Sequence, residues 1–175
     1  MKKQPNILLI TTDTQRWDTL RCMGNPHAIS PNLDRLAREG TLFEQAHTAS
    51  PVCMPARCSL MTGLHTPIHG CIENGVDRRN DIPFVTDFLA EAGYENIMVG
   101  KSHFGPVPDS FHACRITQGE KSRDADDFYA EHIRKHGYNR ASSHPNEIPE
   151  ELFMDAFLVD TTIECIEQTT RASDK

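Results

Sequence analysis

The residues best suited to chemistry lie between positions 50 and 57, where Cys53, Pro55 and Arg57 form the pattern Cys-x-Pro-x-Arg. The pattern stands just before a predicted helix, whose first N–H groups and dipole favour an anion beside Cys53. Arg57 lies one turn further on and can fold back to hold a tetrahedral oxyanion through directed donors. A thiol phosphatase is excluded, because its signature needs a longer spacing between cysteine and arginine. The alternative is a loop cysteine before a helix that starts with proline.

Polar residues also follow two predicted strands. Asp13 ends the run 6–12, and Lys101 and His103 come directly after the run 95–100. Ligands of open α/β sheets bind at the carboxyl ends of the strands. Residues two apart on an extended segment point the same way, so Lys101 and His103 can reach one anionic group. The alternatives are that Asp13 caps a turn and that the basic pair is merely exposed.

A glycine-rich loop over residues 65–75 carries two further polar residues. Asn74 precedes Gly75, and this pair predicts a turn. We expect His69 to pack or to cap a segment locally.

The elements that must position these residues alternate between strands and helices. Short apolar, β-branched runs predict strands over 6–12, 41–48 and 95–100. Helical spacing predicts helices over 55–64, 83–92 and 150–170, and one that Ser30 and Pro31 open and Gly40 closes. This order predicts an α/β fold with a doubly wound, mostly parallel sheet and flanking helices.

Residues 106–149 change in character and become polar, charged and rich in histidine, which predicts a long excursion or insertion over the active face. We therefore divide the chain into a core with the cysteine motif (1–105), this excursion, and a final helical segment (150–175). An amphipathic helix in an α/β fold normally leads into a strand, and none follows here. We expect an incomplete fold whose apolar stripe from Leu152 to Ile166 is uncovered.

Composition and net charge limit the partners and the cellular compartment that we expect. The chain has 175 residues and a net charge of −7, which argues against nucleic acids and anionic membranes as partners. The apolar run Ile7 to Ile10 is too short for a signal peptide or a membrane span, so we expect a cytoplasmic protein. Its six cysteines form no Cys-x-x-Cys pair and are expected to be reduced thiols.

Four segments together resemble a known family. They are the run Pro5 to Ile10 with Asp13, the run Ser30 to Ala37, the Cys53 motif with Ser59 to Gly63 after it, and the run Gly100 to Gly105. In these segments the chain is similar to the type I, formylglycine-dependent sulfatases of the alkaline phosphatase-like superfamily. The resemblance spans most of residues 5–105 and implies the N-terminal part of the sulfatase catalytic domain.

The resemblance implies that a formylglycine-generating, sulfatase-maturating enzyme oxidises Cys53 to 3-oxoalanine, which is called formylglycine. One hydroxyl of its hydrate would attack sulfur and expel the alcohol, and the other would then release sulfate and restore the aldehyde. The resemblance also implies that Arg57, Lys101 and His103 are catalytic. Lys101, His103 and Asn74 would bind the sulfate group, and His103 would assist the leaving oxygen.

The resemblance further implies a divalent cation, Ca²⁺ or in its place Mg²⁺ or Mn²⁺, that polarises the sulfate and the nucleophile. Asp13 resembles one metal ligand, and the oxidised side chain of Cys53 would supply another oxygen. Many family members have a second aspartate next, whereas this chain has Thr14, whose neutral oxygen would take its place.

The expected function is therefore that of a sulfuric ester hydrolase acting on a small-molecule or carbohydrate sulfate ester. Full-length members place further metal ligands beyond residue 175, and Asp13 with Cys53 falls short of the roughly six to eight oxygens that Ca²⁺ prefers. One alternative is a catalytically incomplete fragment. The other is a phosphonate or phosphate ester hydrolase of the same superfamily, although Lys101 with His103 favours sulfate.

Overall fold

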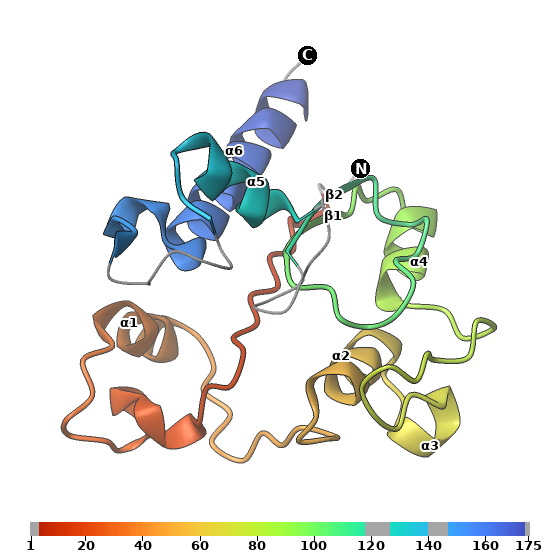
Figure 1. The fold of residues 1–175 in the computed structure, drawn as a ribbon. Coiled ribbons are helices and arrows are strands. Elements are labelled where there is room, and N and C mark those ends of the chain that lie inside the picture. Colours follow the sequence, from red (N-terminus) through yellow and green to blue (C-terminus); the bar gives the residue numbers. More distant parts are fainter. Residues whose placement is uncertain (1–3, 118–126, 140–146, 174–175) are drawn as a thin grey trace. The chain divides into compact units, whose positions relative to one another are not determined.

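The computed structural model describes residues 4–117, 127–139 and 147–173, and side chains only as far as residue 170. It divides into two compact units, Met1–Thr48 and Ala49–Lys175, which we describe separately (Figure 1). Part of the predicted excursion, residues 118–126 and 140–146, lies outside the described residues.

The N-terminal unit contains short helices and no strand in its described part. The 3₁₀ helices η1 (Trp17–Thr19) and η2 (Arg21–Met23) precede the α-helix α1 (Pro31–Glu39). The strands predicted over 6–12 and 41–48 are not formed. A strand exists only within a ladder of hydrogen bonds, and the described sheet consists of strands from the second unit alone.

Helix α1 begins and ends where the sequence predicts. Pro31 occupies its first turn, and the N–H of Gly40 donates to the carbonyl oxygen of Leu36 at its end. The hydroxyl of Ser30 does not cap the helix, however. It donates to a carboxylate oxygen of Asp34 over 3.0 Å and accepts from the N–H of Arg21 over 3.0 Å. These bonds tie η2 to the first turn of α1.

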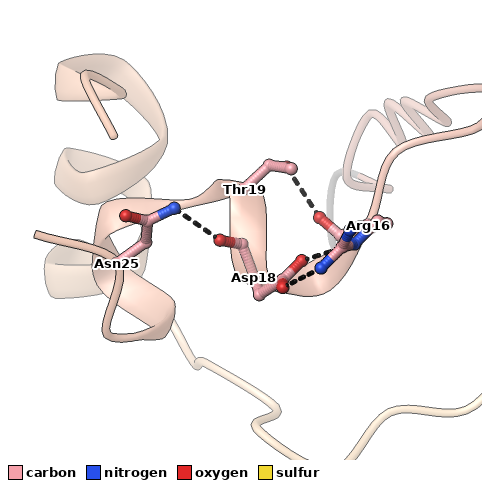
Figure 2. A network of polar contacts seen from close by, with 4 residues as sticks. All are labelled: Arg16, Asp18, Thr19 and Asn25. Atoms are coloured by element: carbon pink, nitrogen blue, oxygen red, sulfur yellow. Dashed lines mark hydrogen bonds and ion pairs between the residues drawn. The ribbon is translucent and has the colours of Figure 1, made fainter. Parts of the chain in front are cut away.

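A second polar network orders the turn around η1 (Figure 2). The guanidinium of Arg16 pairs with the carboxylate of Asp18, and the Thr19 hydroxyl donates to the carbonyl oxygen of Arg16 over 2.7 Å. The Asn25 amide donates to the carbonyl oxygen of Asp18 over 2.7 Å. Hydrogen bonds and an ion pair therefore hold this segment in its conformation.

The second unit begins with the helices α2 (Cys53–Thr62), α3 (Thr66–His69) and α4 (Val85–Glu91). Its main apolar cluster consists of Met54, Cys58, Met61, Cys71, Phe84 and Phe104. The Phe84 and Phe104 rings meet edge to face with centroids 5.1 Å apart, a favourable geometry for aromatic pairs. Gly63 ends α2 in the left-handed conformation, with a φ of 69°.

A parallel two-stranded sheet joins β1 (Ile97–Gly100) to β2 (Ala113–Ile116), with Ile97 opposite Ala113. Strand β1 confirms the strand predicted over 95–100. Strand β2 lies inside the segment 106–149, for which the sequence predicted no strand. The described part of the chain thus has a parallel sheet with helices beside it, as expected of the predicted α/β class.

The last part of the chain contains α5 (Phe128–Lys135), the 3₁₀ helix η4 (Glu150–Leu152) and α6 (Met154–Ser173). Extended backbone at Phe153 interrupts the single helix predicted over 150–170. Phe157 of α6 contacts the rings of Phe128 and Tyr129 of α5, whereas Ile163 is 49% exposed. The predicted stripe is thus partly covered. No helix of the described residues is long and apolar enough to cross a membrane.

Candidate active site

Cys53 is the first residue of α2. The preceding Val52 is extended, and the N–H of Ala56 donates to its carbonyl oxygen over 3.0 Å, which closes the first helical turn. The helix thus starts two residues before the predicted position, and Cys53 stands in its first turn rather than in the loop ahead of it. The Cys53 side chain is half-buried. The positive end of the helix dipole lies beside Cys53, whereas Pro55 has no N–H and the N–H of Ala56 is bonded to Val52.

Asn74 binds the start of this helix from a distant loop. Its side-chain oxygen accepts from the Cys53 thiol over 3.5 Å and from the N–H of Met54 over 3.2 Å. Both partners are donors, which fixes the oxygen toward the helix and turns the amide nitrogen away. The turn predicted at Asn74 is present, and Gly75 has a φ of 87°. Asn74 therefore lies at the nucleophile candidate.

Arg57 connects α2 to the segment after β1. Its guanidinium donates to the carbonyl oxygen of Lys101 over 2.8 Å, and the thiol of Cys58 donates to the carbonyl oxygen of Phe104 over 3.6 Å. The sequence predicted that Arg57 folds back beside Cys53. The bond to Lys101 directs one guanidinium nitrogen toward the carboxyl end of β1, so the helix that carries Cys53 is held at the segment that carries Lys101. The position of Arg57 beside Cys53 stays a prediction.

The segment of Lys101 and His103 is not extended as predicted. His103 has a φ of 46°, and Gly100 ahead of it has a φ of 100°. A left-handed residue breaks the alternation of an extended chain, so the argument that both side chains point the same way does not hold. Ser102 between them is buried, while Lys101 and His103 are half-buried. A non-glycine residue at positive φ is uncommon, and such residues cluster at functional sites.

His69 supports the loop of Asn74 from inside the unit. Its side chain is fully buried, its Nδ1 accepts from the N–H of Cys71 over 3.2 Å, and its Nε2 lies 2.9 Å from the Ser59 hydroxyl. Burial lowers the pKa of His69, because the charged ring loses its hydration. The local packing role expected for His69 agrees with this geometry.

The two cysteines below Cys53 are buried. Burial raises the pKa of Cys58 to about 12, and it raises the pKa of Cys71 as well. A thiol is reactive as its thiolate, so both are poor nucleophiles. The half-buried Cys53 has the better access.

Asp13 and Thr14 belong to the N-terminal unit. The Thr14 hydroxyl donates to a carboxylate oxygen of Asp13 over 3.0 Å, and both residues are exposed. Thr14 has a φ of 58°, which is unusual for a β-branched residue. Within the described ranges no three His, Cys, Asp or Glu residues stand together as a metal site. The pair therefore makes at most part of a cation site.

Sequence reasoning identified Cys53 and Asn74, which the structure brings together, and Arg57 and Lys101, which it also joins. It missed Ser59, which bonds His69. Serine in a helix and histidine in a glycine-rich loop form no recognisable spacing, so the signal was absent.

Comparison with known proteins identifies close sequence relatives. The sequence model of the family described as Sulfatase matches residues 5–174. The ulvan-active sulfatase of Formosa agariphila is 38% identical over 106 residues, which cover 61% of this chain and 21% of that protein. The arylsulfatase of Clostridium perfringens is 38% identical over 120 residues, covering 66% and 25%. For human N-acetylgalactosamine-6-sulfatase the identity is 37% over 124 residues, covering 63% and 24%. The chain thus spans a quarter or less of these relatives.

Solved structures have the same fold. The phosphonate monoester hydrolase of Agrobacterium radiobacter matches with a TM-score of 0.79 at 23% identity, covering 94% of this chain and 38% of that chain. A protein in complex with its substrate D-glucosamine-2-N,6-O-disulfate matches with a TM-score of 0.63 at 30% identity, covering 67% and 24%. The first likeness concerns the fold alone. Together they confirm the predicted α/β class.

Proposed function

The chain belongs to the sulfatase family, and we propose on that premise that it serves the hydrolysis of sulfuric esters with Cys53 as the precursor of the nucleophile. The observation that carries this proposal is the position of Cys53 in the first turn of α2, with Asn74 bonded to it. A helix start places the positive end of the helix dipole near a tetrahedral anion. Formylglycine at this position would supply a hydrated aldehyde as the attacking oxygen.

Positively charged residues of this chain would bind the sulfate group. Sulfate is an anion and the chain carries a net charge of −7, so binding requires a local positive field. The positive charges of Arg57 and Lys101 would supply this field. The two residues lie on neighbouring segments, because the guanidinium of Arg57 is bonded to the backbone of Lys101. We assign sulfate binding to Lys101, His103 and the outward-facing amide nitrogen of Asn74. We assign to His103 the protonation of the leaving alcohol oxygen.

A divalent cation is part of the proposal, and oxygens of Asp13 and Thr14 are its proposed ligands in the N-terminal unit. When bound, Ca²⁺, Mg²⁺ or Mn²⁺ would neutralise charge on the sulfate. The described residues do not form a complete site for it. Asp13 and Thr14 supply fewer oxygens than the roughly six to eight of a Ca²⁺ site.

The proposed substrate is a sulfate ester of a carbohydrate or a small molecule. Names of relatives support this class, since they include an ulvan-active sulfatase and an N-acetylgalactosamine-6-sulfatase, and one related structure holds a glucosamine disulfate. The proposed protein partner is a formylglycine-generating enzyme, which would act on Cys53.

The test is to coexpress the chain with a formylglycine-generating enzyme and to analyse the Cys53 peptide by mass spectrometry. Turnover of an aryl sulfate is then measured with added Ca²⁺, Mg²⁺ or Mn²⁺. Cys53→Ala should abolish both conversion and turnover, whereas the matched control Cys22→Ala should leave both unchanged.

Each outcome separates the alternatives. Conversion with turnover supports a working sulfatase, and conversion without turnover supports a catalytically incomplete fragment. Faster turnover of an aryl phosphonate or phosphate than of the sulfate would favour the other ester class. If Cys53 is never converted while a full-length relative is, the proposal is wrong.

A further inference from the structure

Residues 69–79 form a loop whose two ends meet. The N–H of Arg79 donates to the carbonyl oxygen of His69 over 2.8 Å, which closes the loop at its base. Asn74 and Gly75 lie near the middle of the loop and are exposed. At this point the loop contacts α2, because the N–H of Gly75 donates to the Met54 sulfur over 3.3 Å in addition to the bonds made by Asn74. The loop is thus held at two places, at its base and where its middle meets α2.

Hydrogen bonds at the base define the protonation of His69. Because the N–H of Cys71 donates to Nδ1, this nitrogen carries a lone pair and the proton resides on Nε2. Nε2 therefore donates to the Ser59 hydroxyl, 2.9 Å away. Ser59 belongs to α2, six residues after Cys53 in the same helix. One neutral ring thus ties the beginning of the loop to the helix of the nucleophile.

The two halves of the loop are held by different groups. The returning half is held by Arg78, whose guanidinium lies 4.2 Å from the centre of the Phe84 ring and donates to the carbonyl oxygen of Ile82. The outgoing half, from Gly70 to Glu73, is held by His69 through the N–H of Cys71. This half leads directly into Asn74, so displacement of Cys71 would be passed along the backbone to the Asn74 side chain.

We propose that His69 is a positioning residue: through the N–H of Cys71 and the hydroxyl of Ser59, it holds Asn74 against the thiol of Cys53 and the first turn of α2. This inference deepens the proposed function, because it concerns how the same nucleophile is oriented. His69 touches neither Cys53 nor a substrate. It acts by fixing the loop.

The test measures how accessible the Cys53 sulfur is in the full, unmodified chain. Iodoacetamide is added at neutral pH, and peptide mass spectrometry follows alkylation of Cys53 beside that of Cys22 and Cys165. The Asn74 side-chain oxygen accepts a hydrogen bond from the Cys53 thiol. Loss of this hydrogen bond should speed alkylation. Asn74→Ala and His69→Phe should each accelerate alkylation of Cys53 about two- to tenfold, the range expected for one lost hydrogen bond.

The double variant and a conservative variant distinguish positioning from general loosening. His69→Phe combined with Asn74→Ala should be no faster at Cys53 than either single variant, since both remove the same contact. His69→Asn retains an oxygen that can accept from the N–H of Cys71, so it should recover most of the original rate. Alkylation of Cys22 and Cys165 should stay the same in all variants.

An unchanged rate at Cys53 in a folded His69→Phe variant would overturn the proposal, as would multiplied effects in the double variant.

If His69→Phe does not fold, buried Cys58 and Cys71 become reactive too, and the Ser59→Ala variant then decides. That variant removes the partner of Nε2 with little change in packing. Faster alkylation of Cys53 alone supports positioning, and no change refutes it. These readings need no maturation and no turnover, so they stand apart from the test of sulfatase activity.

Discussion

The two units of the chain differ in how they bury apolar side chains. Between residues 4 and 48 no side chain is buried, and Ile10 is 74% exposed. The second unit encloses Phe84 and Ile133 completely. Order in the first unit rests on polar contacts, such as those around Asp18, whereas order in the second rests on packed side chains.

This difference explains which predicted elements formed. Residues 7–10 have the composition of a strand that is buried on both faces, and such a strand requires neighbours on both edges and covering helices. Within the described residues it pairs with no strand, so it is not one itself. Helix α2 needs no such partner, because its own unit covers Met54 and Cys58. The candidate nucleophile Cys53 therefore lies in the unit that has a core.

The largest expected effect comes from truncating a side chain in that core. Ile133→Ala should lower the free energy of unfolding by about 2–5 kcal/mol, because it removes a fully buried side chain and leaves a cavity. The matched control Leu9→Ala, at a site that is 61% exposed, should change it by less than about 0.5 kcal/mol. Urea denaturation followed by far-ultraviolet circular dichroism measures both. Equal costs would show that the contrast between the units is wrong.

A smaller effect is expected from adding a methyl group at two glycines. Gly105 and Gly24 have φ values of 80° and 97°, so alanine should cost about 1–2 kcal/mol of stability at either position. At Gly105 the new carbon would also lie 2.8 Å from a carboxylate oxygen of Asp77, whereas Gly24 has open space around it. Gly105→Ala should therefore cost more, and adding Asp77→Ala should recover the difference. Thermal unfolding of these three variants, of Asp77→Ala alone and of the original chain measures this, and a larger cost at Gly24 would contradict it.

Acid should weaken the second unit by a modest amount. Because burial lowers the pKa of His69 below its ordinary value of 6.5, the unfolded chain binds more protons than the folded chain just below that pH. The free energy of unfolding should therefore fall as the pH falls through 6.5. His69→Gln should lose less stability than the original chain over this range. The loss of stability that remains in His69→Gln is assigned to His132. The pKa of His132 is lowered by burial and by nearby His136 and Lys135. Identical pH profiles for the two chains would refute the assignment to His69.

The smallest effect is expected at Trp17, the single tryptophan of the chain. Its side chain is 69% exposed in the N-terminal unit, so acrylamide should quench its fluorescence almost equally well in the folded chain and in urea. Strong protection in the folded chain would show that the N-terminal unit buries apolar surface after all. That result would remove the contrast between the units.

The sequence predicted correctly those helices and strands whose ends are marked by proline or glycine. Pro31 and Gly40 delimit α1, and Gly63 ends α2. Gly100 marks the end of β1. It missed β2, because four residues beside a polar, His-rich region show no periodicity, and a strand of that length is defined by its partner.

The site was predicted by residue type rather than by conformation. Cys53 and Asn74 were singled out and lie in contact. The backbone of His103 was not foreseen, since nothing in its neighbours indicates a positive φ. The bond of Arg57 to Lys101 joins residues 44 positions apart, which local patterns do not encode.

The loop over residues 69–79 leaves and rejoins the unit at one point, because Arg79 bonds directly back to His69. Ile72, which is 64% exposed, can be exchanged or flanked by added residues without moving either anchor, provided that Asn74 and Gly75 keep their bonds to α2. Natural variation or laboratory grafting at this place could change which alcohol groups fit beside Cys53 while the helix below stays intact. Substrate preference would then evolve separately from the stability of the protein.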